Sequence, residues 1–398
     1  MNFSKVEEYL DSVKDLYGVR CCDCIVLKDH EVLMRHMTGN YDFADTKPLT
    51  EDNLHDIFSA SKVLTIVGVM TLVEQGKIDL EAELSEYLPE YANLRVVKDF
   101  DLTDFVSTGK FVFGWPGAEA ETVPVKQAPK IWQLMSMTAG FSYQLASPDT
   151  LQLLQENPEA GTRDIVRSWA NDPLLYEPGT RYAYSRAIDV LGAVIEAVSG
   201  ETFGEYMKHH VFEPCGAKEI YYQVPEGAQD RVSVLYVRNP QTGELAESPF
   251  NFARINHTFE SGGGGICCTV EDYAKVLDAL ANDGVAANGN RILTPEFIRK
   301  MAENQLNEQQ LADFHIGETG QAKIAYGYGL GVRTLLDPSR SKSPLGEFGW
   351  DGAAGAYVLV DPKNHLAIFY VQEAVESGPA FIHIHPTLRD LVYEALEA

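Results

Sequence analysis

The chain has few basic residues for its length of 398. Lysine and arginine together number 32, whereas aspartate and glutamate number 58, so the formal net charge is −26. A surface of this sign repels the phosphates of nucleic acids and of anionic membranes unless a local basic patch overrides it. We therefore expect neither a nucleic acid nor a membrane as a partner.

Long hydrophobic runs are also missing. The longest, Val63 to Val73, spans 11 residues, whereas a membrane-spanning helix needs about 20. Near the N-terminus, Val6, Leu10 and Val13 recur at helical spacing among acidic residues. This pattern favours an amphipathic helix over a secretory signal peptide, so we expect a cytoplasmic protein.

Cysteine is scarce, with six residues in the whole chain. Cys21, Cys22 and Cys24 run directly into a strand-like segment, and no second cysteine or histidine pair stands at the spacing of a metal site. A disulfide framework and a zinc site both need more ligands or a different spacing. We expect buried free thiols, no metal and no cofactor.

Several familiar hydrolase signatures do not occur. The chain contains no Gly-x-Ser-x-Gly elbow, no His-Glu-x-x-His motif and no Walker loop. The chain does contain Ser59-Ala60-Ser61-Lys62, which opens a helix that is apolar on nearly all sides and stops near Gly76. Residues three apart on a helix lie about 5–6 Å from each other, so the Ser59 hydroxyl and the Lys62 ammonium are expected to meet. In the alternative, purely structural interpretation, the serine caps the helix and the lysine extends to solvent, without a catalytic role.

Strand-like and helical patterns divide the chain. Alternating or continuous apolar segments occur near both ends, at 19–27, 31–36, 356–360 and 366–372. The intervening part is helical with turn-rich joints, and its glycine run Gly262–Gly265 favours a tight turn packed closely on its neighbours.

This division predicts an α/β (α+β) protein whose two ends build one lobe. We assign residues 1–78 and 262–398 to the α/β lobe and residues 79–261 to a mainly helical lobe. Within the helical lobe, residues 106–126 are predicted to hold a small hairpin.

Six segments, in this order along the chain, resemble motifs of the serine β-lactamase and penicillin-binding-protein superfamily. The resemblance is strongest to its branch of class C β-lactamases and family VIII carboxylesterases. The segments are Ser59–Lys62, Leu72–Leu80, Leu134–Phe141, Glu177–Ser185, Gly262–Asp272 and Phe348–Gly352. The resemblance implies a β-lactamase/DD-peptidase-like fold: an antiparallel sheet flanked by helices, a mainly helical lobe, and an active site between them.

The resemblance also implies roles for individual residues. Ser59 would be the acylated nucleophile, Lys62 its partner, and Tyr184 the general base. A tyrosine must ionise more easily than usual to act at neutral pH, and an adjacent ammonium in a dry site promotes this. The backbone N–H groups of Ser59 and Ala353 would form the oxyanion hole.

Two departures from the family pattern bear on the substrate. Arg186 stands where the family has an asparagine, and Trp350-Asp351-Gly352 replaces a Lys/His-Thr-Gly strand that helps to hold a β-lactam carboxylate. We expect Arg186 and Asp351 to interact and to remove the positive field that an anionic substrate needs. In the alternative, Arg186 binds a substrate carboxylate and Asp351 is turned aside.

These features together predict a serine hydrolase that acts on a small molecule. A carboxylesterase for neutral esters is the first expectation, because tryptophan at position 350 resembles family VIII carboxylesterases. A β-lactamase or D-amino-acid peptidase, and a non-catalytic sensor with the same fold, are the alternatives. The sequence does not predict the oligomeric state.

Overall fold

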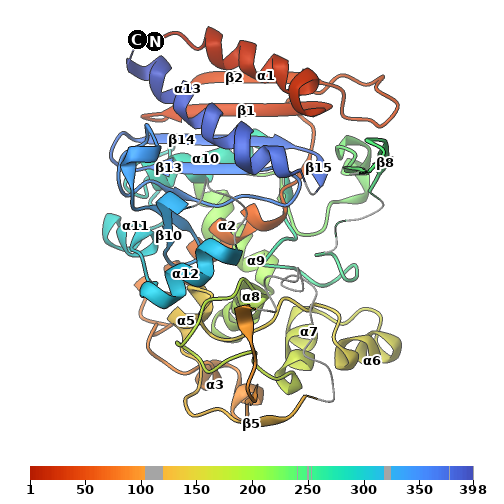
Figure 1. The fold of residues 1–398 in the computed structure, drawn as a ribbon, viewed down its shortest axis with the longest axis vertical. Coiled ribbons are helices and arrows are strands. Elements are labelled where there is room, and N and C mark those ends of the chain that lie inside the picture. Colours follow the sequence, from red (N-terminus) through yellow and green to blue (C-terminus); the bar gives the residue numbers. More distant parts are fainter. Residues whose placement is uncertain are drawn as a thin grey trace.

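The computed structural model describes residues 1–103, 120–239, 241–248, 251, 253–317, 324–375 and 377–397. Its centre is a seven-stranded antiparallel sheet with the strand order β10-β11-β12-β13-β14-β1-β2 (Figure 1). The strands are β1 (Cys21–Lys28), β2 (Glu31–Gly39), β10 (Tyr326–Tyr328), β11 (Arg333–Leu335), β12 (Phe348–Gly349), β13 (Tyr357–Asp361) and β14 (Leu366–Gln372). The two ends of the chain meet in this sheet, where Ile25 of β1 lies opposite Phe369 of β14.

The strand β1 is buried on both faces, which explains why its sequence is mostly apolar and does not alternate with polar residues. Cys22 and Cys24 point into the core on one side of the sheet, and Ile25 points into the core on the other side. All six cysteine side chains are buried and unpaired in the described part of the chain. The strands predicted at 19–27 and 31–36 are present as the antiparallel pair β1 and β2, and the predicted burial of the thiols is confirmed.

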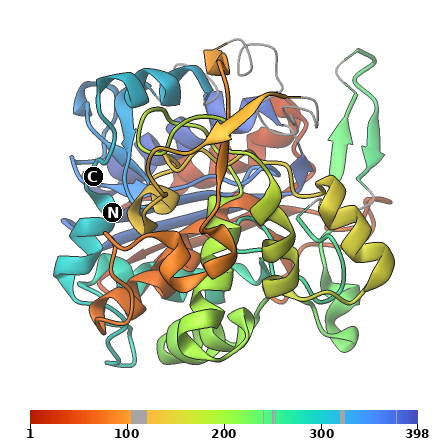
Figure 2. The same ribbon diagram turned by 90° about the horizontal axis from the view of Figure 1, so that it is seen from below.

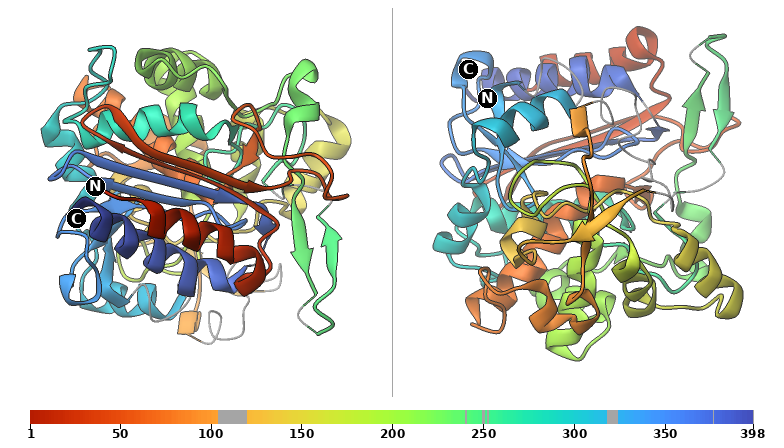
Figure 3. Two further views of the ribbon diagram at one scale, coloured as in Figure 1. Left: turned by 90° about the horizontal axis from the view of Figure 1, so that it is seen from above. Right: turned by 60° about the horizontal axis from the view of Figure 1, so that its bottom comes forward.

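Two helices from opposite ends of the chain cover one face of the sheet. The helices α1 (Ser4–Tyr17) and α13 (His385–Glu397) lie side by side there, seen from above in the left panel of Figure 3. Val6, Leu10 and Leu388 are fully buried between these helices and the sheet. The amphipathic pattern of residues 4–17 therefore folds as expected, because its apolar stripe has a sheet to cover.

The other face of the sheet is covered by α10 (Val270–Ala281), behind which lies α2 (Ser61–Glu74). The Thr269 hydroxyl caps α10 by accepting a hydrogen bond from the Asp272 N–H at 3.3 Å. Every residue from 61 to 72 is buried, and Gly76 adopts a φ of 67° just after the helix. The prediction of a central, buried helix with a glycine stop is confirmed.

Most of the remaining helices lie below the sheet as drawn in Figure 1 and come to the front in Figure 2, whereas α11 (Pro295–Ala302) and α12 (Glu308–Gly317) lie beside β10. The helices below the sheet include α3 (Leu84–Tyr87), α5 (Ile131–Met135), α6 (Pro148–Glu156), α7 (Thr162–Ser168), α8 (Ala187–Ser199) and α9 (Phe203–Met207). None of the described helices is long and apolar enough to cross a membrane. The boundaries of the two lobes, after residue 78 and before residue 262, stay a prediction.

Short strands form three small sheets beside the main one. They are β3 (His55–Asp56), β9 (Cys267–Cys268) and β6 (Ile220–Tyr221); β15 (Ala374–Val375), β7 (Tyr236–Arg238) and β8 (Leu245–Glu247); and β4 (Arg95–Val97) with β5 (Thr122–Pro124). The predicted hairpin at 106–126 lies largely outside the described residues, which omit 104–119. Its C-terminal part, β5, pairs with β4.

Candidate active site

Ser59 lies in a single 3₁₀ turn, Phe58–Ala60, immediately before α2. The residue before it, Phe58, has a φ of +45°, which is rare for a bulky side chain and costs about 1–3 kcal/mol. Buried packing of the Phe58 ring against Leu235 and Ala354 holds this turn in place. Strain of this kind is typical of functional turns, and here it presents Ser59 at the start of the buried helix.

Lys62 is fully buried, and its ammonium contacts three acceptors. Its Nζ donates to the Ser59 Oγ at 3.3 Å, to the Tyr143 hydroxyl at 3.2 Å and to the Gly263 carbonyl at 2.5 Å. An ammonium has three donors, so these contacts compensate for its removal from water. The helical spacing thus brings Ser59 and Lys62 together as predicted.

An aromatic stack stands next to this ammonium. The Lys62 Nζ lies 4.6 Å from the Tyr184 ring centroid, close enough for a cation–π interaction. The Tyr184 ring stacks between Tyr143, at a centroid distance of 5.3 Å, and Trp350, at 5.6 Å. The Trp350 indole N–H also donates to the Tyr184 hydroxyl at 3.2 Å. The structure therefore brings four of the expected site residues, Ser59, Lys62, Tyr184 and Trp350, into one connected cluster.

The turn after Trp350 carries the other expected oxyanion residue. The Gly352 N–H donates to the Ala356 carbonyl at 2.9 Å, and the Gly355 N–H donates to the Gly352 carbonyl at 2.8 Å. A Cβ atom on Gly352 would lie only 2.1 Å from the Ile57 carbonyl oxygen, so glycine is required for this close approach. Ala353 therefore packs against the buried cluster that contains Phe58, next to the 3₁₀ turn that carries Ser59.

Arg186 does not pair directly with Asp351, so the expected ion pair between them is wrong. The Arg186 side chain is 1% exposed; its Nη2 donates to Asp172 Oδ2 at 2.7 Å and its Nη1 donates to the Gln144 carbonyl. The guanidinium also lies 4.8 Å from the Trp169 ring centroid. The sequence does not predict this partner, because Asp172 lies 14 residues away along the chain and the two side chains meet only through the folding of the intervening loop.

Asp351 has a different arginine as its partner. Its Oδ1 accepts from Arg333 Nη1 at 2.9 Å, and the Arg333 Nη2 donates to the Val358 carbonyl at 2.8 Å. The pair is buried, with His385 Nδ1 at 3.8 Å from the same carboxylate oxygen. Asp351 thus forms a structural ion pair within the sheet region, and its charge is balanced there.

Two residues that the sequence did not point to, Tyr143 and Asp189, belong to the site together with Gly263 of the predicted glycine run. Tyr143 bonds Lys62 directly, and Asp189 Oδ1 accepts from the Gly263 N–H at 2.9 Å. A Cβ on Gly263 would lie 2.4 Å from Asp189 Oδ2, which confirms the predicted tight packing of the glycine run. That run was the one available signal, because nothing in the spacing of Tyr143 or Asp189 distinguishes either residue from its neighbours.

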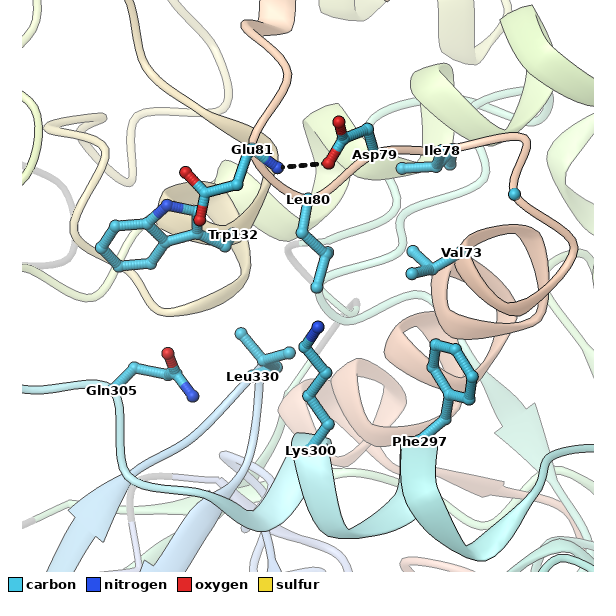
Figure 4. A pocket seen from close by; sticks show the side chains of 11 residues that line it. Val73, Ile78, Asp79, Leu80, Glu81, Trp132, Phe297, Lys300, Gln305 and Leu330 are labelled. Carbon is cyan, nitrogen blue, oxygen red and sulfur yellow. Dashed lines mark hydrogen bonds between the residues drawn. The ribbon is translucent and has the colours of Figure 1, made fainter.

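A separate hollow of about 640 Å³ opens between the end of α2 and α11 (Figure 4). Trp132, Phe297 and Lys300 are among the residues that line it, whereas Ser59, Lys62 and Tyr184 are not. Among the described residues, no group of three or more histidine, cysteine, aspartate or glutamate side chains could hold a metal ion.

Comparisons with known proteins agree on one family and one fold. The profile of a family described as Beta-lactamase matches residues 9–391. Protein Rv1367c of Mycobacterium tuberculosis is 27% identical over 355 residues, which is 87% of this chain and 84% of the relative. Lovastatin esterase of Penicillium rubens is 26% identical over 380 residues, 89% of this chain and 88% of the relative. The solved structure of EstCE1, a hydrolase with promiscuous acyltransferase activity, has a TM-score of 0.75 at 22% identity and covers 98% of both chains.

Proposed function

The chain belongs to the β-lactamase family of serine hydrolases, and from this premise we propose that it forms an acyl-enzyme on Ser59 and hydrolyses small neutral esters. One observation carries the proposal: the Ser59 hydroxyl lies 3.3 Å from a fully buried ammonium whose other partners are a tyrosine and a backbone carbonyl. A relative named as an esterase, lovastatin esterase, aligns along most of the chain and supports this reading.

We assign the proton transfers to Tyr184. The Lys62 ammonium near its ring and the Trp350 N–H donated to its oxygen both favour the tyrosinate form. The tyrosinate would take the Ser59 proton as the serine oxygen attacks the ester carbonyl, and would return that proton to the departing alcohol. Water then attacks the acyl-enzyme by the same route in reverse and releases the acid.

The tetrahedral intermediate needs donors for its negatively charged oxygen. We assign this role to the backbone N–H groups of Ser59 and Ala353. In the described part of the chain, the Ala353 N–H donates to no backbone carbonyl. This supports its assignment as a hydrogen-bond donor to the substrate oxygen. Two such donors supply a large share of the barrier reduction in acyl transfer, about 3–4 kcal/mol for one donor in measured cases.

The preference for neutral esters follows from the ion pairs of Arg186 and Arg333, the arginines at or beside the two motifs that depart from the family pattern. Arg186 and Arg333 are each buried and each bonded to an aspartate, so neither charge is directed at a substrate carboxylate. The net charge of −26 adds a repulsive background for anions. Trp350 supplies an aromatic wall where the family's β-lactamases have a cation and a hydroxyl.

A matched pair of esters tests this preference. Mono-p-nitrophenyl adipate differs from p-nitrophenyl hexanoate by a carboxylate in place of the terminal methyl group. We expect kcat/KM for the hexanoate to exceed that for the adipate at least tenfold, because leaving a charge unpaired in a partly dry site costs more than the roughly 1.4 kcal/mol that a tenfold ratio represents. Nitrocefin, an anionic β-lactam, should be slower than the hexanoate by at least about a hundredfold. Faster turnover of nitrocefin than of the hexanoate would instead assign a β-lactamase, and no turnover of any of these compounds would favour the non-catalytic reading.

Replacement of Tyr184 is expected to lower kcat more than replacement of Tyr143. Tyr184→Phe should lower kcat for p-nitrophenyl hexanoate at least about a hundredfold, because it removes the proposed base. Tyr143→Phe removes only one acceptor of the Lys62 ammonium and should cost about tenfold. KM should stay within about threefold in both variants. Steady-state kinetics on the two purified variants measure this, and a larger loss in Tyr143→Phe than in Tyr184→Phe would transfer the role of base to Tyr143.

A further inference from the structure

A buried carboxylate lies behind the Lys62 ammonium without touching the nucleophile. Asp189, near the start of α8, is 1% exposed. Its Oδ1 accepts two hydrogen bonds, from the Ser261 hydroxyl at 2.5 Å and from the Gly263 N–H at 2.9 Å. Its Oδ2 has no hydrogen-bond partner in the described part of the chain. A fully buried carboxylate with an unsatisfied oxygen is costly, so its presence calls for an explanation.

The backbone of Gly263 connects this carboxylate to the catalytic lysine. The Gly263 N–H faces Asp189, and the Gly263 carbonyl accepts from Lys62 Nζ at 2.5 Å. The neighbouring Gly262 carbonyl accepts from the Thr65 hydroxyl at 2.8 Å, which docks the same loop on α2. A Cβ on Gly263 would lie 2.4 Å from Asp189 Oδ2, so the close approach of the loop to the carboxylate requires glycine at this position.

Electrostatics couples the same two groups. Burial raises the pKa of the Asp189 carboxyl, and the nearby Lys62 ammonium opposes that rise. By reciprocity, an ionised Asp189 supports the protonated form of Lys62. The titratable groups that face Asp189 or Lys62 from the surrounding elements are Arg186, Tyr222, Tyr143 and Tyr184.

We propose that Asp189 is a positioning residue for the reaction at Ser59: through Gly263 it holds the Lys62 ammonium against the nucleophile, and its charge supports that ammonium. This inference rests on the proposed function. It assigns the carboxylate two separable contributions. The hydrogen bond to Gly263 sets where the ammonium lies, and the negative charge sets the pH range in which lysine and tyrosine hold their working protonation states.

Two variants separate these contributions, with p-nitrophenyl hexanoate as substrate. Asp189→Ala removes both and should lower kcat about thirtyfold or more, with KM within about threefold of the unmodified protein. Asp189→Asn keeps an oxygen that accepts from Gly263, so kcat should recover to within about fivefold of the unmodified protein. Both variants should shift the pH profile of kcat to lower pH, because the loss of a negative charge lowers the pKa of a neighbouring lysine and of a neighbouring tyrosine alike.

Asp361→Ala is a matched control. Asp361 is also fully buried and accepts from the Tyr393 hydroxyl at 2.7 Å, but it lies at the end of β13, opposite Leu366 of β14. We expect lower stability in this variant and an unshifted pH profile. If Asp189→Ala does not fold, the pH profile of Asp189→Asn decides, and an unshifted profile overturns the proposal. A kcat for folded Asp189→Ala within threefold of the unmodified protein also overturns it. Failure of the proposed function gives a different result: in that case the unmodified protein itself does not hydrolyse the ester.

Discussion

Replacement of Ser59 by alanine should abolish hydrolysis of p-nitrophenyl hexanoate, with a fall in kcat of at least about 10⁴-fold. The variant has no oxygen to form the acyl-enzyme, and the other groups cannot replace it. The melting temperature should change by only a few degrees, because the lost hydroxyl contacts Lys62, which retains Tyr143 and Gly263 as acceptors. Loss of one such hydrogen bond costs about 1 kcal/mol.

Ser61→Ala is the matched control for this variant. The Ser61 hydroxyl is also buried in the same turn of helix, but it accepts a hydrogen bond from the Ile266 N–H at 3.1 Å and therefore has a structural role. We expect Ser61→Ala to lose stability and to keep kcat within about threefold. Esterase activity that survives in Ser59→Ala and disappears in Ser61→Ala would show that the nucleophile is misassigned.

The second large effect is expected from Lys62→Met. Methionine matches the length of the apolar stem, so the variant removes the ammonium while largely filling its space. The acylation rate, measured as the burst of p-nitrophenol in rapid mixing, should fall about a thousandfold. The reason is that Ser59 loses its contact with the ammonium, and Tyr184 loses the positive charge that favours its tyrosinate form. Adding Tyr184→Phe to this variant should cost little more, because groups that act as a unit are strongly non-additive.

Lys275→Met provides the comparison for Lys62. Lys275 on α10 forms ion pairs with Asp272 and Glu271, at 2.8 Å and 3.0 Å, and lies outside the site. Its replacement should leave the burst rate unchanged within about twofold, since half-exposed ion pairs contribute little. A burst rate in Lys62→Met above a tenth of the unmodified rate would contradict the role assigned to the lysine.

The parts of the site that were predictable from sequence are those set by local geometry. Ser59, in the 3₁₀ turn, and Lys62, in the first turn of α2, are three residues apart, so their contact follows from the helical spacing across this junction. The buried position of α2 follows from its apolar composition on all sides. Strand-like patterns near both ends of the chain also correctly marked the segments that form β1 and β14, which pair in one sheet.

The long-range ion pairs were not predictable in this way. Arg186 and Asp351 were expected to pair because both depart from the family pattern, yet Arg186 pairs with Asp172 and Asp351 with Arg333. Arg333 reaches Asp351 because β11 and β12 are neighbours, with Arg333 opposite Gly349. That register depends on the three-dimensional sheet and is not encoded in the spacing of the charges along the chain.

Covalent labelling of the unmodified protein with a fluorophosphonate tests the central claim most directly. The probe phosphonylates an activated serine, and fragment ions of the modified peptide distinguish Ser59 from Ser61. We predict a single adduct, on Ser59, whose formation is slowed while p-nitrophenyl hexanoate is present in excess and is absent in Ser59→Ala. An adduct on any other residue, or ester hydrolysis by a protein that the probe does not modify, would contradict an acyl-enzyme on Ser59.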